Sequence, residues 1–181
     1  GLIAPLRTIW EVHPTFWLPG VGLRERAKAD RVPYDEWAKT GFLKTTDGPS
    51  VDYDFVAQHL WDVSQRCDIR KIAFDRWNFE HLKPWLLKAG FSEWQIEGDN
   101  AIFQPMGQAF KSMSPALRDL ETAILNENLA HGGHPVMNMC AANAVVQFDA
   151  VGNRMLAKRK SRGRIDGMVA LAMAMSVAGT W

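Results

Sequence analysis

The stretch Ile72-Ala73-Phe74-Asp75-Arg76-Trp77 is a short apolar run that ends on a carboxylate. Residues 51–66 before it carry apolar side chains at helical spacing, and residues 81–89 after it are also helical in pattern. A helix, a strand and a helix in this order are typical of an α/β fold whose strand is parallel and central. The last side chain of such a strand reaches the C-terminal edge of the sheet, where α/β proteins place their sites. The alternative is a buried strand that ends on a solvated aspartate.

The other elements are predicted from apolar periodicity and from the positions of glycine and proline. We expect strands at residues 5–13, 15–18, 69–75, 93–97, 129–131 and 153–157. We expect helices at residues 22–30, 32–41, 51–66, 81–89, 133–147 and 165–178, and one more that starts at Ser114-Pro115. Residues 45–50 are expected to form a loop.

The composition indicates a single domain over residues 1–181, because 47% hydrophobic content is enough to build one core. The formal net charge is +1, so an attraction to nucleic acid has to come from a local cluster. We find no signal peptide and no apolar run long enough to span a membrane. Cys67 and Cys140 are expected as reduced core residues, and most of the eight tryptophans are expected in the core as well.

A second acid, Asp166, stands at the start of the last helix, where the helix dipole stabilises an anion. We predict that Asp75 and Asp166 meet at one metal site. Carboxylate oxygens suit Mg²⁺ or Mn²⁺, ions that hold phosphate oxygens and activate water. The alternative for Asp166 is stabilisation of the helix end alone.

The run Arg154–Arg164 contains six cations and no acid, and it immediately precedes Asp166. In an enzyme that acts on a phosphodiester, such a run would lie beside the scissile backbone and neutralise phosphates. The predicted DNA-binding residues are therefore Lys158, Arg159, Lys160, Arg162 and Arg164. The alternative is a solvated loop.

Two further patterns bear on the chemistry. His131-Gly132-Gly133-His134 has two histidines but no nearby cysteine or carboxylate pair, so a turn before a helix is favoured over a zinc site. The sequence contains no GxxxxGK[ST] phosphate-binding loop, so we expect no ATPase domain in this chain.

Several segments in a fixed order resemble one protein family over almost the whole chain. They are Phe16-Trp17-Leu18-Pro19, Val51-Asp52-Tyr53, the segment 72–77, Gln104 to Pro115, His131 to Val136, Asn143-Ala144-Val145, Lys158 and Ile165-Asp166-Gly167. Their order and spacing resemble the C-terminal nuclease domain of the large terminase subunit of tailed bacteriophages and prophages.

The resemblance implies a ribonuclease H-like mixed sheet flanked by helices and a site with two divalent metal ions that cuts concatemeric double-stranded DNA. The family's acid on the central parallel strand matches Asp75, and its acid at the start of the last helix matches Asp166. The basic loop 154–164 would flank the DNA groove. The implied partners are double-stranded DNA, the phage portal and the small terminase subunit, in the cytoplasm of the bacterial host, with no membrane.

The chain departs from the family pattern at its N-terminal end. The family's first acid lies on a strand upstream of Phe16-Trp17-Leu18-Pro19, and neither that strand nor its aspartate is located here; Glu11 is the nearest acid. We therefore expect an N-terminally truncated fold whose open sheet edge favours a homo-oligomer. The alternative function is a catalytically incomplete DNA-binding or assembly module from a prophage remnant. A resolvase or transposase with the same two acids is a third possibility.

Overall fold

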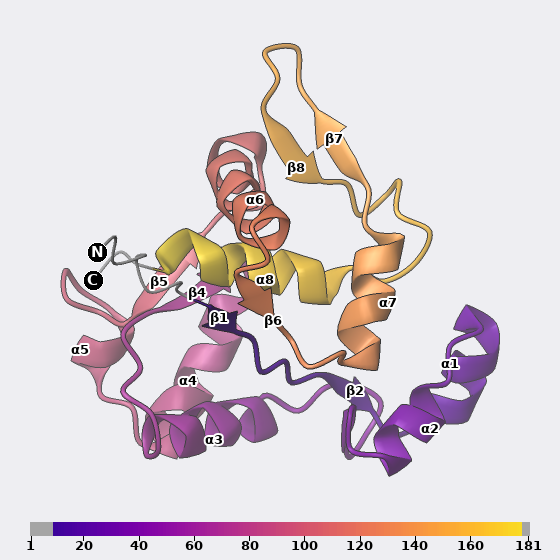
Figure 1. Ribbon diagram of the computed structural model, residues 1–181. Coiled ribbons are helices and arrows are strands. Elements are labelled where there is room, and N and C mark those ends of the chain that lie inside the picture. Colours follow the sequence, from indigo (N-terminus) through magenta and orange to yellow (C-terminus); the bar gives the residue numbers. More distant parts are fainter. Residues whose placement is uncertain (1–8, 179–181) are drawn as a thin grey trace, which may run out of the picture.

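The computed structural model describes residues 9–178, with all their side chains except that of Asn78. The helices in this range are α1 Leu23–Asp30, α2 Tyr34–Lys39, α3 Tyr53–Ser64, η1 Arg76–Asn78, α4 Phe79–Ala89, α5 Glu93–Ile96, α6 Phe110–Leu125, α7 Pro135–Asn143 and α8 Asp166–Val177. The strands are β1 Trp10–Glu11, β2 Trp17–Pro19, β3 Lys44–Thr46, β4 Ile72–Asp75, β5 Phe103–Met106, β6 Leu129–Ala130, β7 Val146–Phe148 and β8 Arg154–Leu156. Helix α8 runs through the middle of the molecule (Figure 1) and packs against α6, α7 and β4.

Within the described residues the strands form four two-stranded sheets, three of them parallel. The parallel pairs are β1 with β6, β2 with β3 and β4 with β5, whereas β7 and β8 form an antiparallel hairpin. In the pair β4–β5, Ile72 lies opposite Phe103 and Asp75 lies opposite Met106. Parallel pairing of strands joined by helices is the arrangement expected of an α/β protein.

The two faces of β4 pack against different cores. Ala73 contacts the apolar cluster built mainly from α6 and α8, whereas Ile72 and Phe74 contact the cluster built mainly from α3 and α4. Since alternate side chains of a strand point to opposite faces, Asp75 shares the face of Ala73. The last carboxylate of β4 therefore projects on the side of the sheet where α8 lies.

The strand pair β4–β5 is held on its other face by aromatic and aliphatic side chains. Phe74 stacks on Phe79 with 3.7 Å between ring centroids, and Leu86 of α4 is fully buried in the same cluster. This packing fixes the strand that carries Asp75 against the helix that follows it.

The predicted strand at residues 93–97 is wrong, because Glu93–Ile96 is helix α5. Ser92 starts this helix, and its backbone N–H and its hydroxyl both donate to Oε1 of the Gln95 side chain. The next strand is instead β5, Phe103–Met106.

The predicted helix start at Ser114-Pro115 is also wrong. Helix α6 already begins at Phe110, so that Pro115 lies inside it. Proline there removes one helical hydrogen bond, but Met113 is only 1% exposed in the core, and this tertiary packing outweighs the local proline signal.

Smaller differences affect the ends of other elements. The expected loop at residues 45–50 overlaps strand β3, and the helix expected over residues 133–147 ends at Asn143, before the β7–β8 hairpin. Of the strand expected over residues 5–13, residues 5–8 lie outside the described residues, and within residues 9–13 the strand is Trp10–Glu11.

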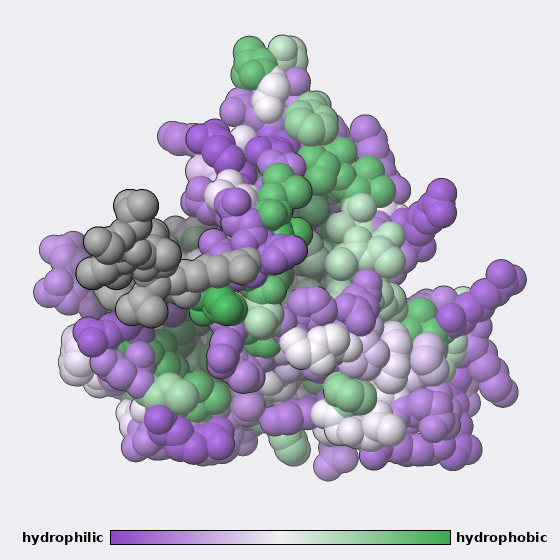
Figure 2. All heavy atoms as spheres, viewed as in Figure 1, coloured by the Kyte–Doolittle hydropathy of each residue, from purple (hydrophilic) through white to green (hydrophobic). Residues whose placement is uncertain are grey.

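The exposure of cysteine and tryptophan side chains differs from what the sequence led us to expect. Cys140 is buried as expected, whereas Cys67 is exposed. Trp77 and Trp94 are 76% and 66% exposed, and none of the tryptophans in residues 9–178 is fully buried, so the expectation that most lie in the core is wrong for this range. Figure 2 shows apolar side chains gathered along and below the β7–β8 hairpin, where Val146, Phe148 and Val151 are exposed. In the described part of the chain, none of the helices has the length and apolar character that a bilayer-spanning helix needs.

Candidate active site

Asp75 ends strand β4 and starts the short helix η1. Its Oδ1 atom accepts a hydrogen bond of 3.2 Å from the backbone N–H of Trp77, and its Oδ2 atom accepts one of 2.6 Å from Nε2 of Gln108. Each carboxylate oxygen has a further lone pair that these bonds do not use. The side chain is therefore held in one orientation while it can still bind a cation.

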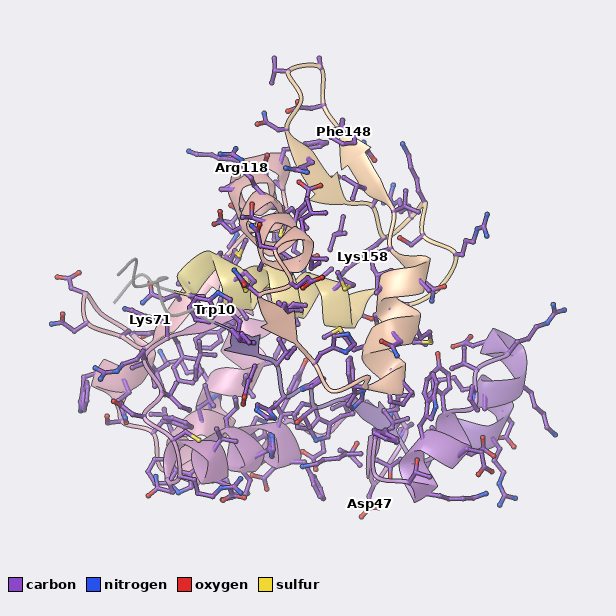
Figure 3. All side chains as sticks on the ribbon, in the orientation of Figure 1. Trp10, Asp47, Lys71, Arg118, Phe148 and Lys158 are labelled. Carbon is purple, nitrogen blue, oxygen red and sulfur yellow. The ribbon has the colours of Figure 1, made fainter. Side chains whose placement is uncertain are left out.

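Asp166 is the first residue of α8, and its side chain is 66% exposed. Its Oδ1 atom lies 3.5 Å from Nζ of Lys158, and Figure 3 shows Lys158 close to this end of α8. The helix dipole adds a second, weak stabilisation of the carboxylate. Gly167 follows and is packed so tightly that an added Cβ would lie 2.9 Å from Phe16 Cζ. The loop and the packing together fix the first turn of α8.

A hollow of about 430 Å³ opens beside Asp166. Its walls come from His13, Phe16 and Trp17 on the N-terminal side and from α7 and α8 on the other. Asp166 is the carboxylate in this largely apolar lining. A ligand of Asp166 would therefore approach it over a surface formed by the segment around β2.

Asp75 and Asp166 are carried by two elements that pack on each other, β4 and α8. A side-chain contact between α8 and the strand ends comes from Ser176, whose hydroxyl lies 3.2 Å from Sδ of Met106. Ser176 stands near the end of α8, about 15 Å along the helix axis from Asp166. Over residues 9–178, no three histidine, cysteine, aspartate or glutamate side chains are grouped closely enough to hold a metal ion. The described contacts therefore bring the C-terminal part of α8, and not Asp166, to the strand end that carries Asp75, and the joint role of the two acids stays a prediction.

The basic loop divides into engaged and exposed cations. Lys158 pairs with Asp166, and Nε of Arg164 lies 3.4 Å from Oδ2 of Asp30 at the end of α1. Arg159, Lys160 and Arg162 are exposed, and they form no ion pair with another described residue. These three are the cations of the predicted DNA-binding set that have no competing protein partner in the described range.

Arg164 instead joins the basic loop to the α1–α2 helix pair. The Tyr34 hydroxyl donates a 2.9 Å hydrogen bond to Oδ2 of Asp30, the oxygen that Arg164 approaches. Burial raises the pKa of Tyr34, and the hydrogen bond to Asp30 raises it further. The three side chains therefore fasten α1 and α2 to the segment that leads into Asp166.

His131 and His134 flank a turn in which Gly132 and Gly133 both have positive φ, at 62° and 69°. The Nδ1 atoms of both rings are buried and have no hydrogen-bond partner in the structure. Burial lowers the pKa of His134, and the charge of His131 lowers it further. Phe16 and Phe42 contact the His134 ring. The segment is the turn that precedes helix α7.

Three residues at this site were not predicted from the sequence. Gln108 lies within the segment Gln104 to Pro115 that carried the family resemblance, but nothing local connects it to Asp75. Asp30 reaches Arg164 only through the fold. Trp77 stands beside Asp75 in sequence, and its exposure could not be read from the apolar pattern.

The sequence and the structure were compared with known proteins. A family model described as "Terminase large subunit, endonuclease domain" matches residues 13–180. The terminase large subunit of Enterobacteria phage HK97 is 45% identical over 170 residues, which are 94% of this chain and 32% of that protein. The chain spans about a third or less of the length of the curated relatives it matches.

Two solved structures resemble the fold. The crystal structure of the HK97 bacteriophage large terminase matches with a TM-score of 0.85. The match spans 94% of this chain and 34% of the HK97 chain. The large terminase nuclease from the thermophilic phage G20c has a TM-score of 0.52 at 16% identity, with 71% of this chain and 64% of that chain covered, and this match concerns the fold alone. These matches confirm the predicted α/β fold of the ribonuclease H-like terminase type.

Proposed function

Because this chain belongs to the family of terminase large subunit endonuclease domains, we propose that it is a metal-dependent endonuclease domain that cuts concatemeric double-stranded DNA during phage DNA packaging. The observation that supports this most is the placement of Asp75. It ends a parallel strand, and both its oxygens are oriented by hydrogen bonds that leave lone pairs for a cation.

Asp75 and Asp166 would hold divalent cations, Mg²⁺ or Mn²⁺, in a two-metal site. Their oxygen donors suit these ions, which when bound activate water and neutralise charge on the phosphate. Two carboxylates leave most of the six positions of an octahedral ion to water or to other ligands. The donor chemistry of the chain therefore fits the metal, and the rest of the shell would come from elsewhere.

The residues of this chain have distinct tasks in the proposed reaction. Gln108 and the Trp77 N–H hold Asp75 in orientation. Arg159, Lys160 and Arg162 bind phosphates near the cut, because they are exposed cations of the loop that leads into Asp166. Lys158 lies close enough to Asp166 to shield its charge until DNA and metal arrive.

The second candidate is a catalytically incomplete DNA-binding or assembly module of prophage origin. It is favoured by the lack of a group of three potential metal ligands among residues 9–178. In either case the proposed partners are DNA, the phage portal and the small terminase subunit, in the cytoplasm of the bacterial host. A homo-oligomer is proposed as well, because two-stranded sheets leave strand edges open to pairing.

Cleavage of supercoiled plasmid in Mn²⁺ tests the proposal. We expect the chain to nick and linearise plasmid, and Asp75→Asn and Asp166→Asn to abolish cutting. Asp68→Asn is the matched control, because Asp68 is an exposed carboxylate near β4 whose partner is Arg70. Cutting by wild type that survives both aspartate variants would disprove the site. No cutting, together with a mobility shift of DNA that persists in EDTA, would favour the second candidate.

A further inference from the structure

An exposed indole lies next to the proposed metal ligand. The Trp77 side chain is 76% exposed, although large aromatic side chains usually bury most of their surface. Removing the large apolar surface of an indole from water lowers the free energy, so an exposed indole can contribute to binding a partner. Trp77 is part of helix η1, which starts from Asp75.

The position of Trp77 relative to Asp75 is fixed by the backbone. The Trp77 N–H donates to Oδ1 of Asp75 over 3.2 Å, which closes a turn at the end of β4. Two residues of chain span at most about 7 Å. Any phosphate that reaches Asp75 therefore brings its nucleotides within reach of the indole.

Arg76 lies beside the Trp77 ring. Its Cζ atom lies 5.6 Å from the centroid of the Trp77 ring, within the range of a cation–π contact. Arg76 is exposed, and no carboxylate of the described residues lies within 4.0 Å of its guanidinium. A guanidinium that lies over one face of an indole which is itself 76% exposed combines a group that binds phosphate with apolar surface that can pack against a sugar.

We propose that Arg76 and Trp77 form a DNA-docking pair at the cleavage site. Trp77 packs its ring against the sugar of one nucleotide of the duplex, and Arg76 binds the adjacent phosphate. The pair places the phosphodiester at Asp75, and neither side chain holds the metal. The inference rests on the proposed function and names a contact of that same site.

The two contacts differ in their dependence on salt, which makes them separable by experiment. A phosphate contact releases counterions, so its loss lowers the slope of log K against log salt concentration by about 0.9. A packing contact releases none. Loss of Trp77 should therefore weaken binding equally at all salt concentrations, whereas loss of Arg76 should weaken it most at low salt.

The test is fluorescence anisotropy of a fluorescein-labelled DNA duplex, titrated with the whole chain in EDTA at several salt concentrations. We expect Trp77→Ala to weaken binding about tenfold with an unchanged slope, because it removes buried apolar surface and no charge. Trp77→Phe should keep most of the affinity, and Arg76→Ala should lower the slope by about one. The matched control is Trp94→Ala, because Trp94 is 66% exposed on α5 and is not part of the proposed site.

The outcomes separate this inference from the proposed function. If wild type binds DNA and cuts plasmid while Trp77→Ala binds as well as Trp94→Ala, the docking pair is disproved and the nuclease proposal stands. If Trp77→Ala lowers the salt slope as Arg76→Ala does, the packing contact is disproved. A wild-type chain that neither binds the duplex nor cuts plasmid would overturn both proposals.

Discussion

Replacing Gly167 by alanine should destabilise the domain at the helix start that carries Asp166. The added Cβ would lie 2.9 Å from Phe16 Cζ and 3.2 Å from Cys140 Sγ, whereas favourable carbon contacts are at about 3.5–4.0 Å. Overpacking of this kind costs about 1–3 kcal/mol. Alanine returns up to about 1 kcal/mol through its better helix propensity. With a mid-range overpacking cost of about 2 kcal/mol we expect a net loss of about 1–2 kcal/mol, or about 2–8 °C in Tm for a chain of this size.

Urea denaturation followed by circular dichroism measures this loss. The matched control is Gly107→Ala, because a Cβ there would meet only Ser112 Oγ at an ordinary 3.5 Å, and we expect its stability to stay within about 0.5 kcal/mol of wild type. Plasmid cleavage by Gly167→Ala should also fall, since relief of the clash moves the turn that holds Asp166. An unchanged urea midpoint for Gly167→Ala would refute the packing argument.

Three further predictions concern the cores and the loop contacts. Leu86→Ala, at a fully buried position of α4, should cost about 2–5 kcal/mol in urea denaturation, and a loss below about 1 kcal/mol would contradict the described packing. A double-mutant cycle of Asp30→Asn and Arg164→Gln should give a coupling of about 0.5 kcal/mol, because the pair is partly exposed, and additive effects would show that the link is not formed in solution. Burial lowers the pKa of His134, so its contribution to stability is complete above the unfolded pKa of about 6.5 and is lost as the pH falls through the lower folded pKa. His134→Asn should flatten this part of the pH dependence in thermal unfolding, and an unchanged profile would rule out the histidine as its source.

The sequence predicted the elements with strong periodicity or clear ends. The helix before Asp75 and the last helix were found within about two residues, because apolar spacing and a buried stripe define both. The strand expected over residues 69–75 is found at Ile72–Asp75, with the predicted C-terminal end and parallel pairing, but in the described residues it pairs with β5 alone and is not central. The start of α6 was predicted wrongly for a physical reason. Pro115 is typical of the first turn of a helix, but the helix already begins at Phe110 because Met113 is buried in the core.

The candidate site was accessible from the sequence only in part. Asp75 was identifiable because it ends an apolar run, and Asp166 because it opens a helix after a basic loop. The hydrogen bond from Gln108 to Asp75 and the link from Asp30 to Arg164 join residues far apart in the chain, and such contacts leave no local pattern. The distribution of the basic loop into paired and exposed cations likewise depends on tertiary neighbours.

Among the described residues β4 pairs with one neighbour, β5, and this gives its backbone two different sides. The Ile72 N–H donates to the Ile102 carbonyl over 2.7 Å, and alternation along a parallel ladder turns the Phe74 N–H the same way. The amides of Ala73 and Asp75 then point to the opposite edge of the strand, away from β5. Deuterium uptake along these four residues should alternate, slow at positions 72 and 74 and faster at 73 and 75. Deuterium uptake at the Asp75 amide would thus slow down whenever another strand or a bound molecule forms hydrogen bonds along that edge.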